Sequence, residues 1–199
     1  LSSTGGTLSL PGGGTLVSGA SFTTSNTTLK LGGTLDIADT WVSTNTSLSL
    51  TANAELSSTA AAGLATLETN GYDFKLASDT TELTLANVFT LATGTLSTQG
   101  ADLIFASRAD ISSGATLDAS GGGKLEFQLG GTDNGTINAE NATFKIGAAY
   151  AVPGTLKTNG STTWTLGTVN LDLSGGTLEL GGTVTLDYIL TDNQTKFKL

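Results

Sequence analysis

Histidine, cysteine and methionine are absent from these 199 residues. Without His or Cys, the chain lacks the commonest general base, the thiolate nucleophile and the usual zinc ligands. The lack of Cys also excludes disulfide bonds, although it does not fix the cellular compartment. These absences remove most hydrolase mechanisms, and we expect no catalytic site, no metal site and no cofactor.

Positive charge and long apolar runs are also scarce. Lys and Arg number 8 against 17 Asp and Glu, which gives a formal net charge of −9. Because so few cations cannot neutralise a run of phosphates, we expect no nucleic-acid partner. No apolar run approaches the roughly 20 residues of a membrane helix, so we expect no membrane insertion of this segment. The sequence starts at Leu1 without methionine, and we expect a processed product or a piece of a longer protein.

Four residue types dominate the composition: 37 Thr, 30 Leu, 27 Gly and 19 Ser. Apolar and polar residues alternate in short runs such as Leu83-Thr84-Leu85, which indicates short strands with one buried face. Gly-Gly and Asn-Gly steps between the runs suit tight corners. A helical turn or two is predicted only between Ala60 and Leu67. No composition break is visible, so residues 1–199 are expected to form one domain.

A repeat of about 20 residues emerges when nine apolar anchors are aligned. The anchors are Leu16, Leu35, Leu56, Leu76, Leu96, Leu117, Ile137, Leu156 and Leu178. The residue before the anchor is Thr in seven of the nine cases, and the residue two before is Gly in six. Chance placement would give about two Thr and about one Gly. Each coil therefore starts with a Gly-Thr-Leu unit.

Further apolar runs follow the anchors after about seven and about fifteen residues, as Leu83 and Leu91 follow Leu76. Three short strands per coil predict a triangular cross-section, and parallel crossovers favour the right hand. The expected fold is all-β: a right-handed parallel β-helix, or β-solenoid, of about ten coils.

The coil register is least regular between residues 56 and 96. Glu55 and Lys75 replace the Thr of the repeat, and Leu67 competes with Leu76 as an anchor. A longer, irregular coil is the alternative in this segment. If the regular register holds, Glu55 and Lys75 lie on adjacent coils about 4.8 Å apart and form a lateral ion pair.

Coils of this length, rich in Thr, Ser, Asn and Gly and free of Cys, resemble the passenger domains of autotransporters and exported adhesins of the filamentous haemagglutinin type. The likeness covers the whole chain, but it lies in the repeat pattern and matches no unique motif. It implies a rigid extracellular rod on the bacterial cell surface, with a structural or adhesive role and a host-surface or glycan receptor. No residue-level function is carried over.

The alternative function is a carbohydrate-binding or carbohydrate-active β-helix, such as a phage tailspike-like domain. Carboxylates alone can serve a glycosidase if they converge on one groove. The acids here fall at different phases of the coil, so we expect no enzyme. These acids are Asp36, Asp73, Asp102, Asp110, Asp118, Glu126, Glu140, Asp172 and Glu179.

Calcium binding and ice binding are two further candidate functions, and each has a simpler structural explanation. The calcium nonapeptide is absent, because Gly121-Gly122-Gly123 is followed by Lys124-Leu125-Glu126. Thr132-Asp133-Asn134-Gly135 predicts a turn rather than a cation site. An ice-binding face needs identical hydroxyl residues in a row, whereas the outward residues that follow the anchors are charged and irregular. The Thr of the repeat is therefore interpreted as a strand former.

Aromatic residues and sequons complete the candidates. A stack inside the solenoid, rather than a sugar-binding stripe, is predicted for Phe105, Phe127, Phe144 and Trp164. Exposed contacts are predicted for Trp41, Tyr150 and Tyr188, which fit the alternation less well. Composition explains most of the six N-x-[ST] sequons, and glycosylation stays open for Asn26, Asn45, Asn134, Asn141, Asn159 and Asn193.

Neither terminus has the features of a cap. Leu1 to Leu10 already contains Gly6-Thr7-Leu8, and Lys196-Phe197-Lys198-Leu199 stops inside an alternating strand. Open solenoid ends expose unpaired strand edges. We therefore expect end-to-end self-association or continuation into neighbouring repeats of a longer chain.

Overall fold

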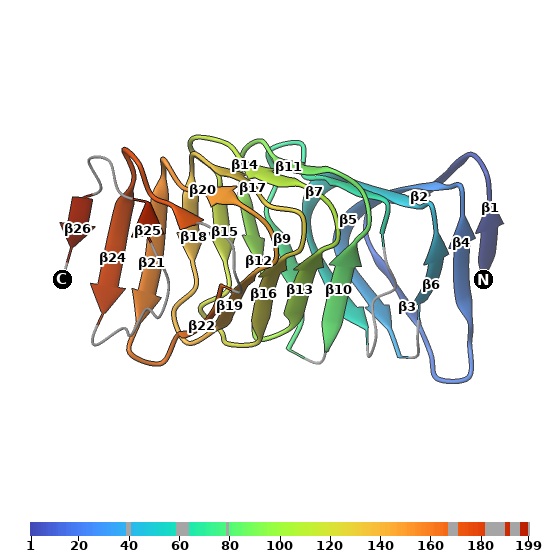
Figure 1. The fold of residues 1–199 in the computed structure, drawn as a ribbon. Helices are drawn as coiled ribbons and strands as arrows, with labels where there is room; N and C mark the ends of the chain where they lie inside the picture. Colours follow the sequence, from blue (N-terminus) through green and yellow to red (C-terminus); the bar gives the residue numbers. More distant parts are fainter. Residues whose placement is uncertain are drawn as a thin grey trace.

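The computed structural model describes residues 1–38, 41–58, 64–78, 80–166, 171–181, 190–191 and 196–198. The chain winds into an elongated stack of turns, with the first and last strands at opposite ends (Figure 1). The pairings between the described strands are parallel, and these residues form no helix. Eight turns have all three strand segments described, close to the ten coils expected. The predicted all-β parallel solenoid is confirmed.

Three faces, which we name A, B and C, run along the stack. Face A is made of two sheets, and an isolated bridge between Leu64 and Leu85 lies at the break between them. Its strands are β1 (Ser2–Thr4), β4 (Phe22–Ser25), β6 (Trp41–Thr44), β10 (Glu82–Leu85), β13 (Asp102–Phe105), β16 (Lys124–Phe127), β19 (Thr143–Ile146) and β22 (Thr163–Thr165).

Faces B and C share two long strands, β5 (Thr28–Ile37) and β7 (Ser47–Ser58), whose first halves lie on face B and second halves on face C. Face B further contains β2 (Thr7–Leu10), β8 (Thr66–Glu68), β11 (Phe89–Leu91), β14 (Ala109–Ile111), β17 (Gly131–Asp133), β20 (Tyr150–Ala151), β23 (Leu171–Asp172) and β25 (Leu190–Thr191). Face C further contains β3 (Gly14–Leu16), β9 (Phe74–Leu76), β12 (Thr95–Ser97), β15 (Thr116–Asp118), β18 (Thr136–Asn138), β21 (Thr155–Asn159), β24 (Thr177–Gly181) and β26 (Lys196–Lys198).

The alternating sequence explains the strands, because each short run turns one side chain in and its neighbours out. On β15, Leu117 is fully buried while Thr116 and Asp118 are half-buried. Corners end the strands after three to five residues in most turns. Asn26 and Asn45 occupy one row of corners with positive φ angles of 49° and 48°, a conformation that Asn tolerates better than most residues.

Six of the eight predicted anchor pairings are confirmed. The two exceptions are shifts by two residues: Leu16 pairs with Ile37, and Leu96 pairs with Phe74 instead of Leu76. A shift by two keeps the same face inward, so the alternation is unaffected.

The irregular middle of the chain keeps the short coil as far as Leu76. Glu55 pairs with Lys75 and Leu56 with Leu76, as the regular register predicts. Leu67 pairs with Leu48 on face B and is therefore not an anchor. In the stretch from Ala60 to Leu67, the described part holds the strand β8 and no helix, while residues 59–63 lie outside the described residues.

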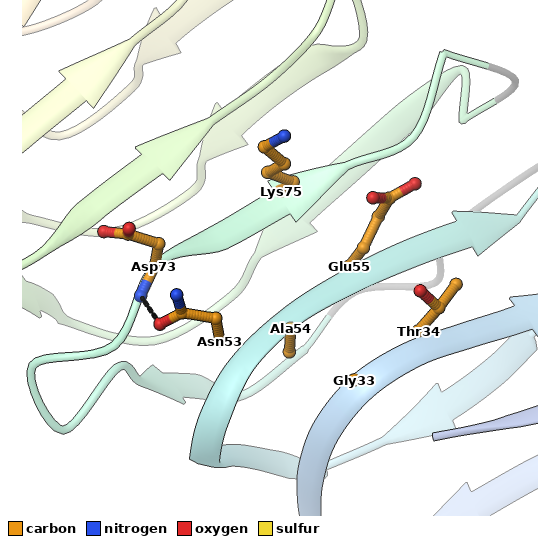
Figure 2. Close-up of a pocket in the computed structure, with 7 residues that line it drawn as sticks. All are labelled: Gly33, Thr34, Asn53, Ala54, Glu55, Asp73 and Lys75. Carbon is orange, nitrogen blue, oxygen red and sulfur yellow. Dashed lines mark hydrogen bonds between the residues drawn. The ribbon is translucent and has the colours of Figure 1, made fainter. Parts of the chain in front are cut away.

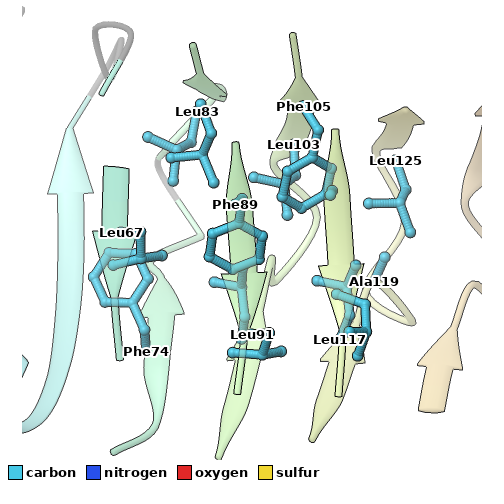
Figure 3. Packing of buried hydrophobic residues seen from close by; sticks show 14 of the residues in the cluster. Leu67, Phe74, Leu83, Phe89, Leu91, Leu103, Phe105, Leu117, Ala119 and Leu125 are labelled. Atoms are coloured by element: carbon cyan, nitrogen blue, oxygen red, sulfur yellow. The ribbon is translucent and has the colours of Figure 1, made fainter. Parts of the chain in front are cut away.

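A single hydrophobic cluster fills the interior along the described turns, and Figure 3 shows part of it. Its aromatic rings stack from turn to turn, with centroids 5.1 Å apart for Phe89 and Phe105 and 4.9 Å for Phe105 and Phe127. Phe144 is buried as well, and Trp164 packs partly buried against the cluster. The predicted internal aromatic stack is confirmed.

The predicted exposure of Trp41 and Tyr150 is wrong. Trp41 is fully buried because its Nε1 donates a hydrogen bond to the Thr24 hydroxyl at 2.9 Å and its ring packs against Phe22. Tyr150 is 1% exposed and packs against Phe127, with ring centroids 4.4 Å apart. Tyr188 lies outside the described residues.

Candidate functional site

The register of face C changes at two places. β5 bends between Leu31 and Gly33, where the pairing with β7 shifts, and the two-residue slip between β9 and β12 follows two turns later. The outward residues keep partners across both places, since Glu55 pairs with Lys75 and Lys75 pairs with Ser97, so their row continues along the face. An open depression lies beside the register shift between β5 and β7.

We call this depression the polar hollow, and Figure 2 shows its lining. It has a volume of about 410 Å³. It is lined by Gly33, Thr34, Asn53, Ala54, Glu55, Asp73 and Lys75. The side chains come from three successive turns, through β5, β7 and β9 with the residues that precede them.

Side chains replace backbone groups in the hydrogen bonding of the polar hollow. The Asp73 N–H donates to Asn53 Oδ1 at 3.1 Å, and the Thr95 N–H donates to Asp73 Oδ1 at 2.9 Å. These bonds join three turns at the point where the strands slip. Asn53 and Asp73 therefore hold the backbone that shapes the hollow.

The predicted ion pair between Glu55 and Lys75 does not form, although the register that places them side by side is correct. The ion pairs found among the described residues do not include it. Further along the same face, Lys157 and Glu179 are equivalent neighbours and approach to 3.9 Å. Glu55 and Lys75 thus offer an acceptor and a donor to solvent in the hollow (Figure 2).

The other acids predicted to be scattered are scattered. Asp36, Asp118 and Glu179 lie on face C, Asp102 and Glu126 on face A, and Asp110 and Asp172 on face B. Among the described residues no three His, Cys, Asp or Glu gather in a metal-binding arrangement. The structure does bring Glu55 and Asp73 to one hollow, which sequence reasoning did not foresee. The signal available was the loss of the repeat Thr before both Leu56 and Leu76.

A second polar feature is a charge ladder on face A. Lys124 lies between Asp102 at 3.5 Å and Glu126 at 3.4 Å, and Lys145 contacts Glu126 at 2.8 Å. Burial opposes ionisation of Glu126, but the bonds from Lys145 and Lys124 outweigh it and lower the pKa of that carboxyl. The ladder ties three turns together and leaves little free charge.

The segment Thr132 to Gly135 forms the predicted turn, in which Asp133 Oδ1 accepts the Gly135 N–H at 2.8 Å. Unlike the other acids placed by the structure, Asp133 turns its carboxyl into the core and is 0% exposed. Period two predicts this orientation, since its pairing partner Ile111 also points inward. The prediction of a turn alone gives no orientation for the Asp133 carboxyl.

The described sequon asparagines lie at corners or strand ends and bond between turns. Asn45 Nδ2 donates to Asn26 Oδ1 at 2.8 Å, and Asn159 Nδ2 donates to Asn141 Oδ1 at 3.0 Å. These amide nitrogens therefore contribute to the ladder along the rod. Asn193 lies outside the described residues, and glycosylation stays a prediction.

The class of this protein is defined by its fold, because comparisons with known proteins add no relative. Family models, curated proteins and solved structures were each searched, and none matches this chain. Within the described part of the chain, no helix is long and apolar enough to span a membrane. The coordinates define a parallel β-solenoid.

Proposed function

We propose that this chain is a structural or adhesive β-solenoid module that displays binding surfaces on an extended rod. The observation that supports it is face C, where ten strands from β3 to β26 follow one another in a single parallel sheet along the whole stack. Such a sheet holds its outward side chains at fixed spacings of about 4.8 Å. The rod therefore positions polar groups along its length.

The same architecture suits a load-bearing element. Each turn bonds to the turns before and after it, and the hydrophobic cluster is continuous through the turns. Repeat proteins of this kind gain stability from nearest-neighbour interfaces. The function of the chain then depends on what its faces present, with no catalytic step.

The bacterial cell surface is the proposed location, and the resemblance to exported adhesins in repeat pattern is its support. The proposed partners are a host-surface or glycan receptor and neighbouring copies or repeats at the rod ends.

Adhesion and assembly can be tested on the isolated chain. Beads coated with it should bind host cells or a glycan array more strongly than beads coated with a heat-denatured sample. Electron microscopy and sedimentation at increasing concentration should show rods that lengthen end to end. A soluble monomer that binds neither cells nor glycans would contradict the proposal.

A second candidate, carbohydrate binding, is favoured by the polar hollow. Glu55, Lys75 and Thr34 present acceptors and donors around a space of about 410 Å³, which suits the hydroxyl groups of a saccharide. The test is a glycan array with the double variant Glu55→Gln, Lys75→Gln. The matched control is Lys157→Gln, Glu179→Gln on the same face. Loss of a glycan signal in the first variant alone would support this candidate, and equal signals in both would refute it.

A further inference from the structure

One ionisable side chain lies in the interior of the solenoid without a charged partner. Asp133, at the end of β17, is 0% exposed and pairs in register with Ile111 of the preceding turn. Its Oδ1 accepts the Gly135 N–H at 2.8 Å. Its Oδ2 is buried and has no hydrogen-bond partner among the described residues.

A second unsatisfied polar group lies on the next turn. Tyr150 pairs in register with Gly131, and its ring packs against Phe127. The Tyr150 hydroxyl is buried and finds no partner within the part of the chain that the structure describes. A buried polar group without a partner costs free energy, so two of them on adjacent turns mark a weak point in the core.

Arg108, on the same side of the rod as β14 and β17, is already paired with another acid. Arg108 donates from its Nε to both carboxylate oxygens of Asp110, at 3.0 and 2.8 Å. Asp110 in turn accepts the Thr132 N–H at 2.9 Å. The other titratable groups on the strands around β17 are Asp118 on β15, Lys124 and Glu126 on β16, Lys145 on β19, Lys157 on β21 and Asp172 on β23.

The protonation of the two core groups follows from their burial. Burial raises the pKa of Asp133 from 3.8 to about 7, and the hydrogen bond from Gly135 opposes this only in part. Burial, followed by the charge of Asp133, also raises the pKa of Tyr150 well above its ordinary value. Both groups are therefore neutral in mildly acidic solution.

We propose that Asp133 is a pH-sensitive latch in the core, closed while its carboxyl is protonated and weakened when it ionises. A protonated carboxyl carries an O–H donor for the interior, whereas a carboxylate brings an unpaired charge into it. The turn from β17 to β18 and the adjoining strand β20 then open more readily.

The direction of the pH dependence is fixed by the raised pKa. The folded state holds this proton more tightly than the unfolded state, so the stabilisation is fully present below about pH 4. It is lost progressively as the pH rises to about 7, and above that the loss is complete. Ionisation of Asp133 should shift the folding equilibrium by about a hundredfold to a thousandfold toward the unfolded state.

The test compares Asp133→Asn with the unchanged chain in chemical unfolding between pH 4 and 9. The variant should lose the pH dependence between about pH 4 and 7, so that its stability relative to the unchanged chain rises with pH. Glu140→Gln, which removes a half-buried acid from a nearby corner, should keep that dependence. Hydrogen exchange at the Gly135 and Gly154 amides should accelerate above about pH 7 beyond the ordinary base-catalysed increase in the unchanged chain alone.

Infrared spectroscopy gives an independent reading. The unchanged chain at pH 5 should show a buried protonated carboxyl band that Asp133→Asn lacks. Equal pH slopes for the two proteins, or the absence of that band, would overturn the latch. If Asp133→Asn does not fold, the carboxyl band of the unchanged chain is followed with pH instead, and its absence at pH 5 or its persistence at pH 9 would overturn the latch.

Discussion

The Thr-Leu pair at a repeat anchor places two neighbouring side chains in opposite environments. Leu117 is 0% exposed and surrounded by the core, while Thr116 stands half-buried on face C beside Thr136 of the next turn. Leu117→Ala should lower the free energy of unfolding by about 2 to 5 kcal/mol because it leaves a cavity. Thr116→Ala should lower it by about 1 kcal/mol or less. Urea unfolding measures both, and an equal or larger loss for the threonine would reverse the assignment of inside and outside.

Gly131 illustrates a residue whose lack of a side chain is required. Its φ is +150°, and a Cβ there would collide with the carbonyl oxygen of Ala109. Gly131→Ala should therefore cost about 2 to 4 kcal/mol and force the paired backbones of β14 and β17 apart. Gly14→Ala is the control, since no atom lies within 4 Å of its added methyl group. Near-ultraviolet circular dichroism and thermal unfolding would report both effects, and an unchanged melting temperature in Gly131→Ala would show that the turn can relax.

At this scale the sequence predicts the apolar interior well and the polar interior poorly. The leucine anchors recur about every 20 residues, and the hydrophobic effect places them in the interior. Trp41 and Tyr150 carry polar atoms, and their burial goes with the bond to the Thr24 hydroxyl and the packing on Phe127, contacts that only the fold reveals. The sequence correctly predicts that Asp133 lies in a turn. A turn prediction does not say that the carboxyl points into the core.

The strands of face A are joined by charge as well as by backbone bonds. Glu126, whose side chain is 9% exposed, bridges Lys124 and Lys145. Glu126→Gln should lower stability by about 1 to 3 kcal/mol, because it leaves two ammonium groups without their shared partner. Glu179→Gln breaks the more exposed contact with Lys157 and should cost about 0 to 1 kcal/mol. Guanidinium is unsuitable because it screens charge, so urea unfolding at low and high salt is the measurement, and equal losses would contradict this ranking.

Strand register is the element property that the sequence could predict only in part. The anchors from Leu96 to Leu178 align because each coil repeats the same unit. The slip between Phe74 and Leu76 could not be predicted, because a shift by two residues preserves every inward side chain. The polar hollow lies beside a different irregularity, the register shift between β5 and β7, which an alignment of anchors does not reveal.

The whole molecule should tolerate the removal of one complete turn. Thr155 is the register partner of Thr136, and both follow a glycine. Deleting Thr136–Gly154 would place Thr155 beside Thr116, while Trp164 and Leu171 would take the places of Phe144 and Tyr150. The shortened chain should fold into a rod about 4.8 Å shorter, with somewhat lower stability.

The control for this deletion removes Thr136–Ile146, which takes out the strands of two faces and leaves β20. Because the remaining segment cannot close a turn in register, this variant should aggregate or unfold. Far-ultraviolet circular dichroism and small-angle scattering would distinguish the two chains. Folding of both, or of neither, would show that the turn is not the unit of this architecture.

Paired strands are close to each other in the sequence, and this affects how the molecule folds. Strand partners such as Leu117 and Ile137 come from consecutive turns. No strand has to wait for a segment from the opposite end of the chain. Folding rates rise when contacts are local in sequence, and a linear array can start at any point and grow outward. During synthesis, turns that have already emerged can therefore fold before the rest of the chain is made. Each new turn then pairs with the exposed strand edges of the turn before it.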